Sequence, residues 1–221
     1  MTRSPSAPYV VPFAVFMGLL AMQSQFPMPD LADQCVRLVV LSGTLLWIAR
    51  RAIDLRIRSW GGSVLIGILV FVVWVAPDIL APAYRHHWLF ENPVTGVGRG
   101  ALSAGGRTDP LVLALRTLRA AVIVPIVEEL FWRAWLMRWL ISPDFLKIPL
   151  GTYAPVPFWL VAILFASEHG SYWDVGLAAG VIYNWWMIRV KSLGDLILTH
   201  AVTNLCLSIY VIAAGKWEYW L

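Results

Sequence analysis

Charged residues are scarce in this chain, and their scarcity excludes most soluble folds. Of 221 residues, only 14% are Asp, Glu, Lys or Arg, whereas 59% are hydrophobic. Soluble domains have about 25% charged and about 45–50% apolar residues. No charged residue occurs between residues 3 and 30, 58 and 78, or 147 and 168. Each gap can hold a helix of about 20 residues, which is enough to span the ~30 Å hydrocarbon core of a bilayer. The sequence therefore predicts an integral, multi-pass membrane protein.

Cysteine and concentrated basic charge are also missing. The two cysteines, Cys35 and Cys206, lie in or near apolar segments and are too few for a disulfide framework. The net charge of +4 is spread along the chain. Nucleic-acid-binding proteins concentrate Lys and Arg on one surface, so we expect no nucleic-acid partner. The HExxH motif of a zinc protease and the GxSG motif of a serine protease are absent as well.

Apolar runs of helical length predict an all-α polytopic membrane bundle of about seven transmembrane helices, with six and eight as limits. The expected helices cover residues 9–25, 35–49, 62–80, 111–140, 155–168, 174–188 and 195–214. Pro125 is expected to interrupt the fourth helix because proline removes one backbone hydrogen bond. Arg116 and Arg119 place the first half of that helix at the membrane interface. Residues 83–110 are predicted to form a surface loop or lid.

Basic residues in short loops predict the orientation of the bundle, because such loops are cytoplasmic. One basic cluster follows the second helix and another follows the sixth. With seven helices, both clusters fall on one side of the membrane, which should be the cytoplasmic side together with the amino terminus. The residues are Arg50, Arg51, Arg56, Arg58, Arg189 and Lys191.

Two adjacent glutamates, Glu128 and Glu129, lie inside the apolar run 120–140. A charged side chain at the bilayer centre costs about 2.5–3.5 kcal/mol on insertion scales, so such residues usually have a function. Glu129 and Arg133 are four residues apart and share one helix face, which predicts an ion pair. Glu128 is rotated from Glu129 by about 100° and is free to face another element.

Two other predicted helices carry imidazoles. Phe165 and His169 are four residues apart, and so are His200 and Asn204, so each pair shares a helix face. A free carboxylate, two imidazoles and a carboxamide can activate water and stabilise an oxyanion. Imidazole and carboxylate can also bind zinc. The same groups build proton relays and ion pathways, so a carrier remains an alternative.

Several neighbouring features have a structural interpretation. Gly176 and Gly180 form a GxxxG pattern that permits close helix approach. Asp174 and Asp195 stand at helix starts and predict N-caps. Glu168 is either an interfacial residue or an acid that perturbs the site. A tryptophan series fits a membrane-interface belt or, alternatively, the wall of an apolar substrate groove. The series consists of Trp132, Trp135 and Trp139.

Three motifs together resemble one family. EELFWR at 128–133 matches EExxxR, FASEH at 165–169 matches FxxxH, and HAVTN at 200–204 matches HxxxN. They occur in the order found in the CPBP intramembrane endopeptidases, the family of the type II CAAX prenyl endopeptidases and their bacterial relatives. The tryptophan-rich segment 128–140 is similar to a bacterial subgroup associated with exosortase-type sorting systems. The resemblance covers about 111–214, the expected catalytic core. Residues 1–110 would add transmembrane helices and the long loop to the same single membrane domain.

The resemblance implies an all-helical membrane fold and hydrolysis of a peptide bond within or beside the bilayer. In the family, the first Glu acts on water as a base, the first His orients that water, and the second His and the Asn form the oxyanion pocket. The catalytic candidates are therefore Glu128, His169, His200 and Asn204, supported by Glu129, Arg133 and Phe165. A metal-free mechanism is favoured and no cofactor is expected; if zinc is used, its ligands would be Glu128, His169 and His200.

The expected partners are the lipid bilayer and a protein or peptide substrate. Candidate substrates include lipidated proteins and proteins with a membrane-proximal C-terminal segment. The resemblance favours the inner membrane of a bacterium. The alternative from another class is a non-proteolytic membrane protein, either a proton or ion carrier or an immunity or scaffold protein that keeps the fold.

Overall fold

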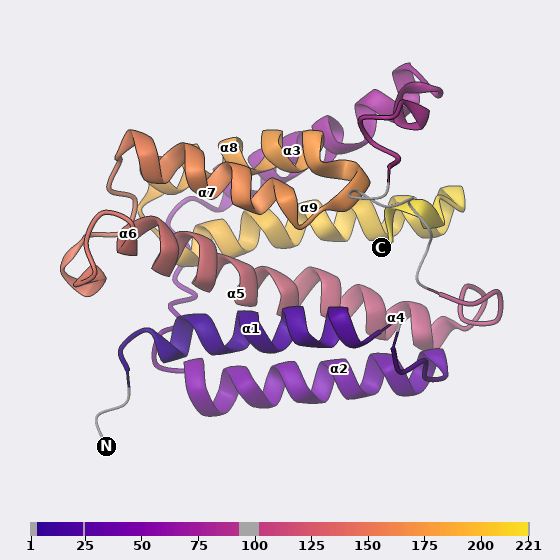
Figure 1. Cartoon of the computed structure of the whole chain (residues 1–221), viewed down its shortest axis with the longest axis horizontal. Coiled ribbons are helices and arrows are strands. Elements are labelled where there is room, and N and C mark those ends of the chain that lie inside the picture. The colour runs from indigo at the N-terminus through magenta and orange to yellow at the C-terminus, as the bar shows by residue number, and fades with distance from the viewer. Residues whose placement is uncertain (1–3, 24, 93–101, 221) are drawn as a thin grey trace.

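All regular elements in the described part of the chain are helical, and seven of them are long (Figure 1). The computed structural model describes residues 4–23, 25–92 and 102–220. The predicted all-α bundle and the number of long helices are confirmed. The helices are α1 Ala7–Met22, α2 Asp30–Thr44 with a π-type extension Leu45–Ala49, α3 Trp60–Leu80, a continuous run Pro110–Trp139 that contains α4 to α6, α7 Pro155–Ser167, α8 Trp173–Val190 and α9 Leu193–Ala214.

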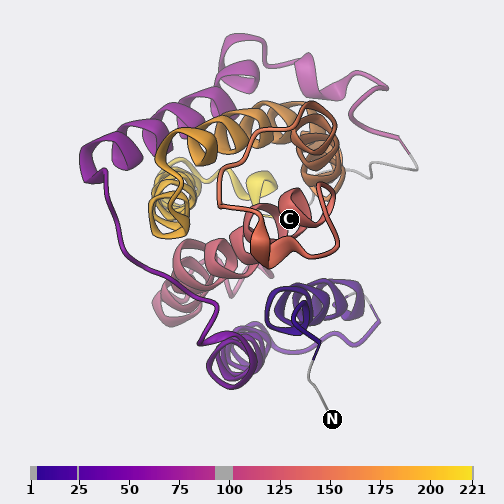
Figure 2. The same ribbon diagram turned by 90° about the vertical axis from the view of Figure 1, so that its left-hand side faces the viewer.

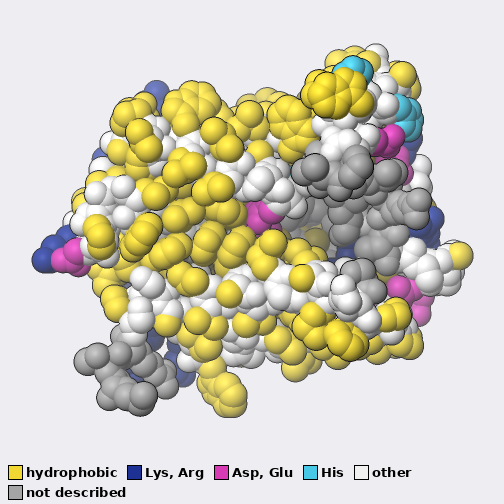
Figure 3. Space-filling model, in the orientation of Figure 1, with side chains coloured by type: hydrophobic (Ala, Val, Ile, Leu, Met, Phe, Trp, Pro, Cys, Tyr) yellow, Lys and Arg dark blue, Asp and Glu magenta, His cyan; other side chains and the backbone are white. Residues whose placement is uncertain are grey.

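The outer surface of the bundle is apolar, as a lipid-embedded protein requires (Figure 3). Trp47 and Leu80 are 87% and 83% exposed, and soluble proteins rarely leave large apolar patches open to water. Four helices are long and apolar enough to cross a membrane, namely Asp30–Ala49, Trp60–Leu80, Pro110–Trp139 and Leu193–Ala214. Two further apolar helices are shorter: α1 has 16 residues and α7 has 13. The fold is thus a helical membrane bundle.

The run Pro110–Trp139, here called the long helix, lies in the middle of the bundle (Figure 1). It consists of α4 Pro110–Leu118, a π-type segment Arg119–Ile123, α5 Val124–Glu129, a second π-type segment Leu130–Leu136 and α6 Met137–Trp139. The interruption expected at Pro125 takes the form of the first π-type segment, whose wider turn precedes the proline.

Helices α1 and α2 pack on one side of the long helix, and α3, α7, α8 and α9 pack on the other (Figure 2). The start of α1 and the ends of α2 and the long helix lie at one end of the bundle, with the amino terminus. The end of α1 and the starts of α2 and the long helix lie at the other end, where α9 finishes (Figure 1). We call these the amino end and the carboxyl end of the bundle.

Helices α3 and α9 lie close together, so the first 110 residues share a core with the last hundred. A Cβ on Gly67 of α3 would stand 2.6 Å from the carbonyl oxygen of Thr199 on α9. The hydroxyl of Thr203, one turn further, donates to the Gly67 carbonyl at 2.9 Å. The division at residue 110 stays a prediction. In the expected loop 83–110, residues 84–86 form a 3₁₀ turn, and residues 93–101 lie outside the described residues.

Two expected N-caps are wrong. The N-cap of α9 is Ser192, whose hydroxyl accepts from the Asp195 N–H at 3.3 Å. The carboxylate of Asp195 instead accepts from the backbone N–H groups of Arg58 and the next residue, each at 2.7 Å, and so anchors α9 to the start of α3. Asp174 lies inside the first turn of α8, where it forms an ion pair of 2.6 Å with Arg85. Both acids bind groups from distant segments, which local sequence does not reveal.

Candidate active site

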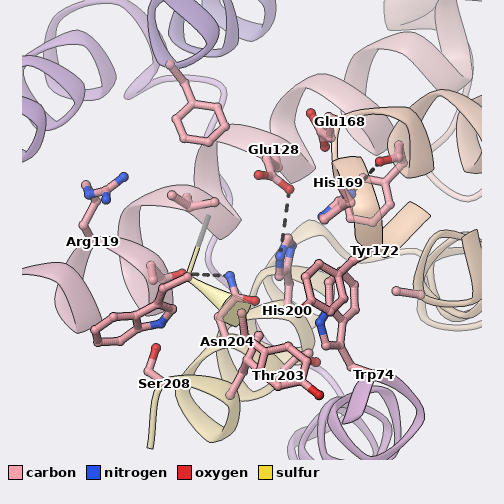
Figure 4. A pocket seen from close by; sticks show the side chains of 18 of the residues that line it. Trp74, Arg119, Glu128, Glu168, His169, Tyr172, His200, Thr203, Asn204 and Ser208 are labelled. Carbon is pink, nitrogen blue, oxygen red and sulfur yellow. Dashed lines mark hydrogen bonds and ion pairs between the residues drawn. The ribbon is translucent and has the colours of Figure 1, made fainter. Parts of the chain in front are cut away.

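A cavity of about 420 Å³ lies inside the bundle, between the long helix, α8, α9 and the turn after α7 (Figure 4). Helices α1 and α3 and the last residues of the chain complete its wall. The polar lining side chains are Gln23, Arg116, Arg119, Glu128, Glu168, His169, Tyr172, Tyr183, His200, Thr203, Asn204, Ser208 and Tyr219. The cavity therefore brings together the four catalytic candidates from the three motifs.

A buried charge chain links the long helix to α9. Arg133 Nη1 lies 3.1 Å from Glu129 Oε1, as the spacing of four residues predicts. The same Glu129 oxygen lies 2.8 Å from His200 Nδ1. All three side chains are buried, and those of Glu129 and Arg133 are fully enclosed. Because a carboxylate only accepts, His200 donates its Nδ1–H to Glu129, and this bond fixes the orientation of the imidazole.

Glu128 faces the other nitrogen of the same imidazole. Its Oε2 atom lies 3.9 Å from His200 Nε2, whereas Glu129 holds Nδ1 (Figure 4). The two adjacent glutamates therefore contact one histidine from different directions, as their rotation around the helix requires. A neutral His200 with its proton on Nδ1 offers an electron pair at Nε2. His200 donates a hydrogen bond from Nε2 only when it carries a second proton.

His169 lies in the short turn between α7 and α8. Its Nδ1–H donates to the carbonyl oxygen of Phe165 at 2.7 Å, so that Nε2 is left for other partners. The ring packs edge-on against Trp74 of α3, with ring centroids 5.1 Å apart. His169 approaches the cavity from this turn and His200 from α9, and both lie on the same side of the cavity as Glu128 (Figure 4).

Asn204 compensates for the proline of the long helix. The N–H of Val124 donates to Arg119, five residues back, and the next position, Pro125, has no N–H for the Ala120 carbonyl. Asn204 Nδ2 donates to this carbonyl at 2.9 Å. One Nδ2 hydrogen is used in this bond, and the second is available to a ligand in the cavity.

The side chain of Phe165 supports the site by packing, in addition to the hydrogen bond that its carbonyl accepts from His169. The guanidinium carbon of Arg133 lies 4.4 Å from the centroid of the Phe165 ring. The centroid of the His169 ring lies 4.7 Å from the same centroid. Arg133 Nε also donates to Asn184 Oδ1 at 3.0 Å, and Asn184 Nδ2 in turn donates to the Phe158 carbonyl at 2.8 Å. Asn184 was not identified from sequence, although an amide in a membrane helix is a signal that points to such a role.

Several residues in the wall of the cavity were also not predicted from the sequence. Trp74 and Trp220 line the cavity, whereas the tryptophan series of the long helix does not appear in its wall. Trp132 is instead buried and donates to Glu168 Oε1 at 3.1 Å, which places that acid beside the site. Arg116 and Arg119 turn inward to the cavity and are buried. The interfacial position of the first half of the long helix stays a prediction.

The glycines of α8 position His169. A Cβ on Gly176 would stand 3.2 Å from His169 Cγ and Nδ1, and one on Gly180 would stand 3.1 Å from Ala162 of α7. The close approach predicted from the GxxxG pattern is therefore confirmed. It allows the end of α7 to bring the imidazole against α8.

Replacing Gly176 by Ala is expected to lower activity by about tenfold while the protein still folds, because overpacking displaces groups by tenths of an ångström and misplacement costs rate. Peptide cleavage and thermal unfolding in detergent would be measured side by side. Gly18→Ala is the matched control, since no atom lies within 4 Å of a Cβ at that position of α1. Equal activity of the two variants would contradict the positioning role of Gly176.

The donor set does not form a ready metal centre. Among the described residues, no three His, Cys, Asp or Glu side chains converge as a metal-ligand group. His200 Nδ1 and His169 Nδ1 are already bonded within the protein, so each imidazole offers only Nε2. Zinc would need a rearrangement of Glu128, His169 and His200 to bring their atoms within about 2.0–2.2 Å of one point.

Comparison with known proteins gives one family. Residues 110–206 match the family described as type II CAAX prenyl endopeptidase Rce1-like. This range contains the long helix, α7, α8 and most of α9, with all residues of the three motifs. No curated protein and no solved structure matches the chain.

Proposed function

Because the chain belongs to the family of the type II CAAX prenyl endopeptidases through residues 110–206, we propose that it is an intramembrane endopeptidase in which Glu128 activates water. The family implies a peptidase with a protein or peptide substrate. One observation carries the residue assignment. Glu128 Oε2 and His200 Nε2 lie 3.9 Å apart in a cavity that His169 and Asn204 also line.

Water would be held between Glu128 and His169. Glu128 accepts one hydrogen from the water, and His169 Nε2 accepts the other, because the Nδ1–H of His169 is bonded to the Phe165 carbonyl. The water oxygen then attacks the carbonyl carbon of the scissile bond while its proton moves to the Glu128 carboxylate. The C–N bond subsequently breaks, and Glu128 returns the proton to the leaving nitrogen. No redox partner is needed, since one water is consumed for each bond cut.

His200 and Asn204 would stabilise the oxyanion that forms during the attack. For this role His200 must carry a proton on both nitrogens, and the Glu129 carboxylate at 2.8 Å stabilises that cation. Arg133, whose Nη1 lies 3.1 Å from Glu129 Oε1, holds that carboxylate in place. The free hydrogen on Asn204 Nδ2 supplies the second donor. Preorganised donors of this kind supply much of the rate enhancement in hydrolases.

The substrate would be a membrane-associated polypeptide, either lipidated or with a membrane-proximal C-terminal segment. The apolar outer surface supports a substrate that is itself held at the membrane. We place the protein in the inner membrane of a bacterium, as a relative of the exosortase-associated subgroup, on the basis of its motif resemblance. The region 111–214 would act as the catalytic core of a single membrane domain.

The substrate can be identified by comparing the termini of membrane proteins in cells that produce either the unmodified protein or the Glu128→Gln variant. A terminus present only with the unmodified protein names the substrate and the bond that is cut. Purified protein in liposomes then tests cleavage of that substrate directly. Ion flux without cleavage would show that the protein is a carrier and not a protease. If neither cleavage nor ion flux is detected, the scaffold alternative is supported.

Asn204→Ala is expected to lower kcat by about 10²–10³, since this is the usual effect of removing one oxyanion donor. KM should change little, because the interaction strengthens only in the transition state. Single-turnover cleavage of the identified substrate measures the effect. Thr203→Val alters the adjacent lining residue and serves as the comparison. An unchanged kcat for Asn204→Ala would remove this residue from the proposed oxyanion pocket.

Chelators are expected to leave activity intact, because the proposed steps use only groups of the chain and water. Purified protein would be treated with chelator, analysed for zinc content and assayed with and without added zinc. Activity that disappears on chelation and returns with zinc would contradict the metal-free mechanism and point to Glu128, His169 and His200 as ligands.

A further inference from the structure

The cavity extends from Glu128 towards only one end of the bundle. On the long helix, the lining residues run back from Glu128 to Arg116, a distance of about 18 Å along the axis. On α9 they run forward from His200 to Ser208. Both directions lead to the carboxyl end of the bundle, where the long helix begins and α9 finishes (Figure 1). Trp220 also contributes to the wall of the cavity. In the described structure, no residue nearer the amino end than Glu128 on the long helix lines the cavity.

The two ends of the bundle differ in charge. The amino end carries the basic loops, whereas the carboxyl end carries fewer basic residues together with several acids at helix ends and in loops. At the amino end, among the described residues, lie Arg50, Arg51, Arg56, Arg58, Arg138, Lys147, Arg189 and Lys191, with Asp54 and Asp144. At the carboxyl end, among the described residues, lie Asp30, Asp78, Glu91, Asp109, Asp174 and Glu218, with Arg85, Arg107 and Lys216.

Loops rich in Lys and Arg remain in the cytoplasm, and acids have little influence on orientation. The amino end is therefore cytoplasmic, and the carboxyl end faces the opposite side. We propose that the active-site cavity opens to the non-cytoplasmic side of the membrane, and that it receives polypeptide segments already exposed on that side which bring an anionic group to Arg119. That these segments are substrates rests on the proposed function, whereas the direction in which the cavity opens does not.

The outer part of the cavity is positively charged. Arg119 is 6% exposed, and its Nε donates to Gln34, a neutral amide, at 3.3 Å. The nearby acid Asp33 is occupied by Arg37, which holds both of its oxygens at 2.7 and 2.8 Å. A carboxylate or a similar anionic group of a substrate would complement this charge, because charge buried in a low-dielectric wall attracts its opposite strongly.

Thiol labelling tests the direction of the opening. Cys35 and Cys206 are first replaced by Ser, and single cysteines are introduced at three positions in the Glu128→Gln background. Ser208→Cys reports on the cavity, Ala104→Cys on the exposed surface of the carboxyl end, and Leu146→Cys, 56% exposed in the structure, on the amino end. A membrane-impermeant methanethiosulfonate is added to intact spheroplasts of a bacterial expression host and, separately, to permeabilised ones.

In intact spheroplasts, we expect Ala104→Cys and Ser208→Cys to react and Leu146→Cys to react only after permeabilisation. The opposite pattern would overturn the orientation. Reaction of Ala104→Cys without that of Ser208→Cys would overturn the opening of the cavity to this side. If Ser208→Cys fails to fold, Leu207→Cys on the same wall gives the same readout. Labelling does not depend on catalysis, so a protein without protease activity can still satisfy the prediction.

Charge selectivity tests the anion subsite. Ser208→Cys is reacted with anionic sulfonatoethyl and with cationic trimethylammonioethyl methanethiosulfonate, each rate being normalised to that of free cysteine. The anionic reagent is expected to react about tenfold faster, because a cleft lined by positive charge raises the local concentration of anions. Arg119→Gln should reduce this preference at Ser208→Cys and leave the ratio at Ala104→Cys unchanged. Equal rates for both reagents in the parent protein would overturn the subsite.

Discussion

Replacing Glu128 by Gln is expected to lower the rate of peptide cleavage by about 10³–10⁴, with folding unaffected. The amide keeps the size of the side chain but cannot accept a proton from water, and general base catalysis contributes about 10²–10⁴ to rate. The rest of the charge chain should remain, because Glu129 and not Glu128 holds His200 Nδ1. Single-turnover cleavage by purified protein measures the effect.

Glu168→Gln is the matched control for this substitution. Glu168 is also an acid in the wall of the cavity, but its Oε1 accepts from Trp132 at 3.1 Å, and the proposed steps do not use it. We expect its amide variant to retain activity within about tenfold. If Glu168→Gln is inactive and Glu128→Gln is active, Glu168 and not Glu128 is the base that activates water. Substantial turnover by Glu128→Gln alone would end the glutamate mechanism.

Breaking the Glu129–Arg133 pair is expected to cost about 3–5 kcal/mol of stability, because either single substitution leaves a charge buried without its partner. Both side chains are fully enclosed and lie 3.1 Å apart. Glu129→Gln and Arg133→Met should each lower Tm in detergent by roughly 10 °C or more. The double variant should lose less than the sum of the two, since both charges disappear together.

Cleavage should not recover in the double variant. Without the Glu129 carboxylate, His200 loses the acceptor that fixes its Nδ1 proton and stabilises its charged form. Stability and activity are thus expected to separate, which a purely structural pair would not show. Asp144→Asn breaks an exposed pair with Lys147 and should leave Tm unchanged. Additive losses in the double variant would show that the two residues act independently.

The sequence predicted the helices of the site better than its walls. Apolar runs located the seven long helices, and spacing of four residues placed Glu129 beside Arg133 and brought His200 and Asn204 to one face. These are local relations, and helical geometry determines them without knowledge of the partner helix.

Relations between helices could not be predicted in the same way. Asp195 resembled an N-cap, but its carboxylate binds backbone at the start of α3, about 137 positions away in the chain. Arg116 and Arg119 were noted for their charge alone, and their burial in the wall of the cavity was not predicted. Trp74 carries no motif, and it contacts His169 only because α3 folds beside the catalytic core. Such contacts depend on tertiary packing, which periodicity does not encode.

The missing N–H of Pro125 in the long helix fixes the position of a side chain on α9. This missing N–H leaves the Ala120 carbonyl to Asn204, so the amide of α9 has a fixed anchor before any ligand arrives. An alanine at position 125 would supply the missing N–H to the long helix. The Ala120 carbonyl would then no longer need Asn204, and the carboxamide of Asn204 would be free to rotate. The imperfection is thus a form of preorganisation, and a substitution that stabilises the isolated helix would loosen the group facing the cavity.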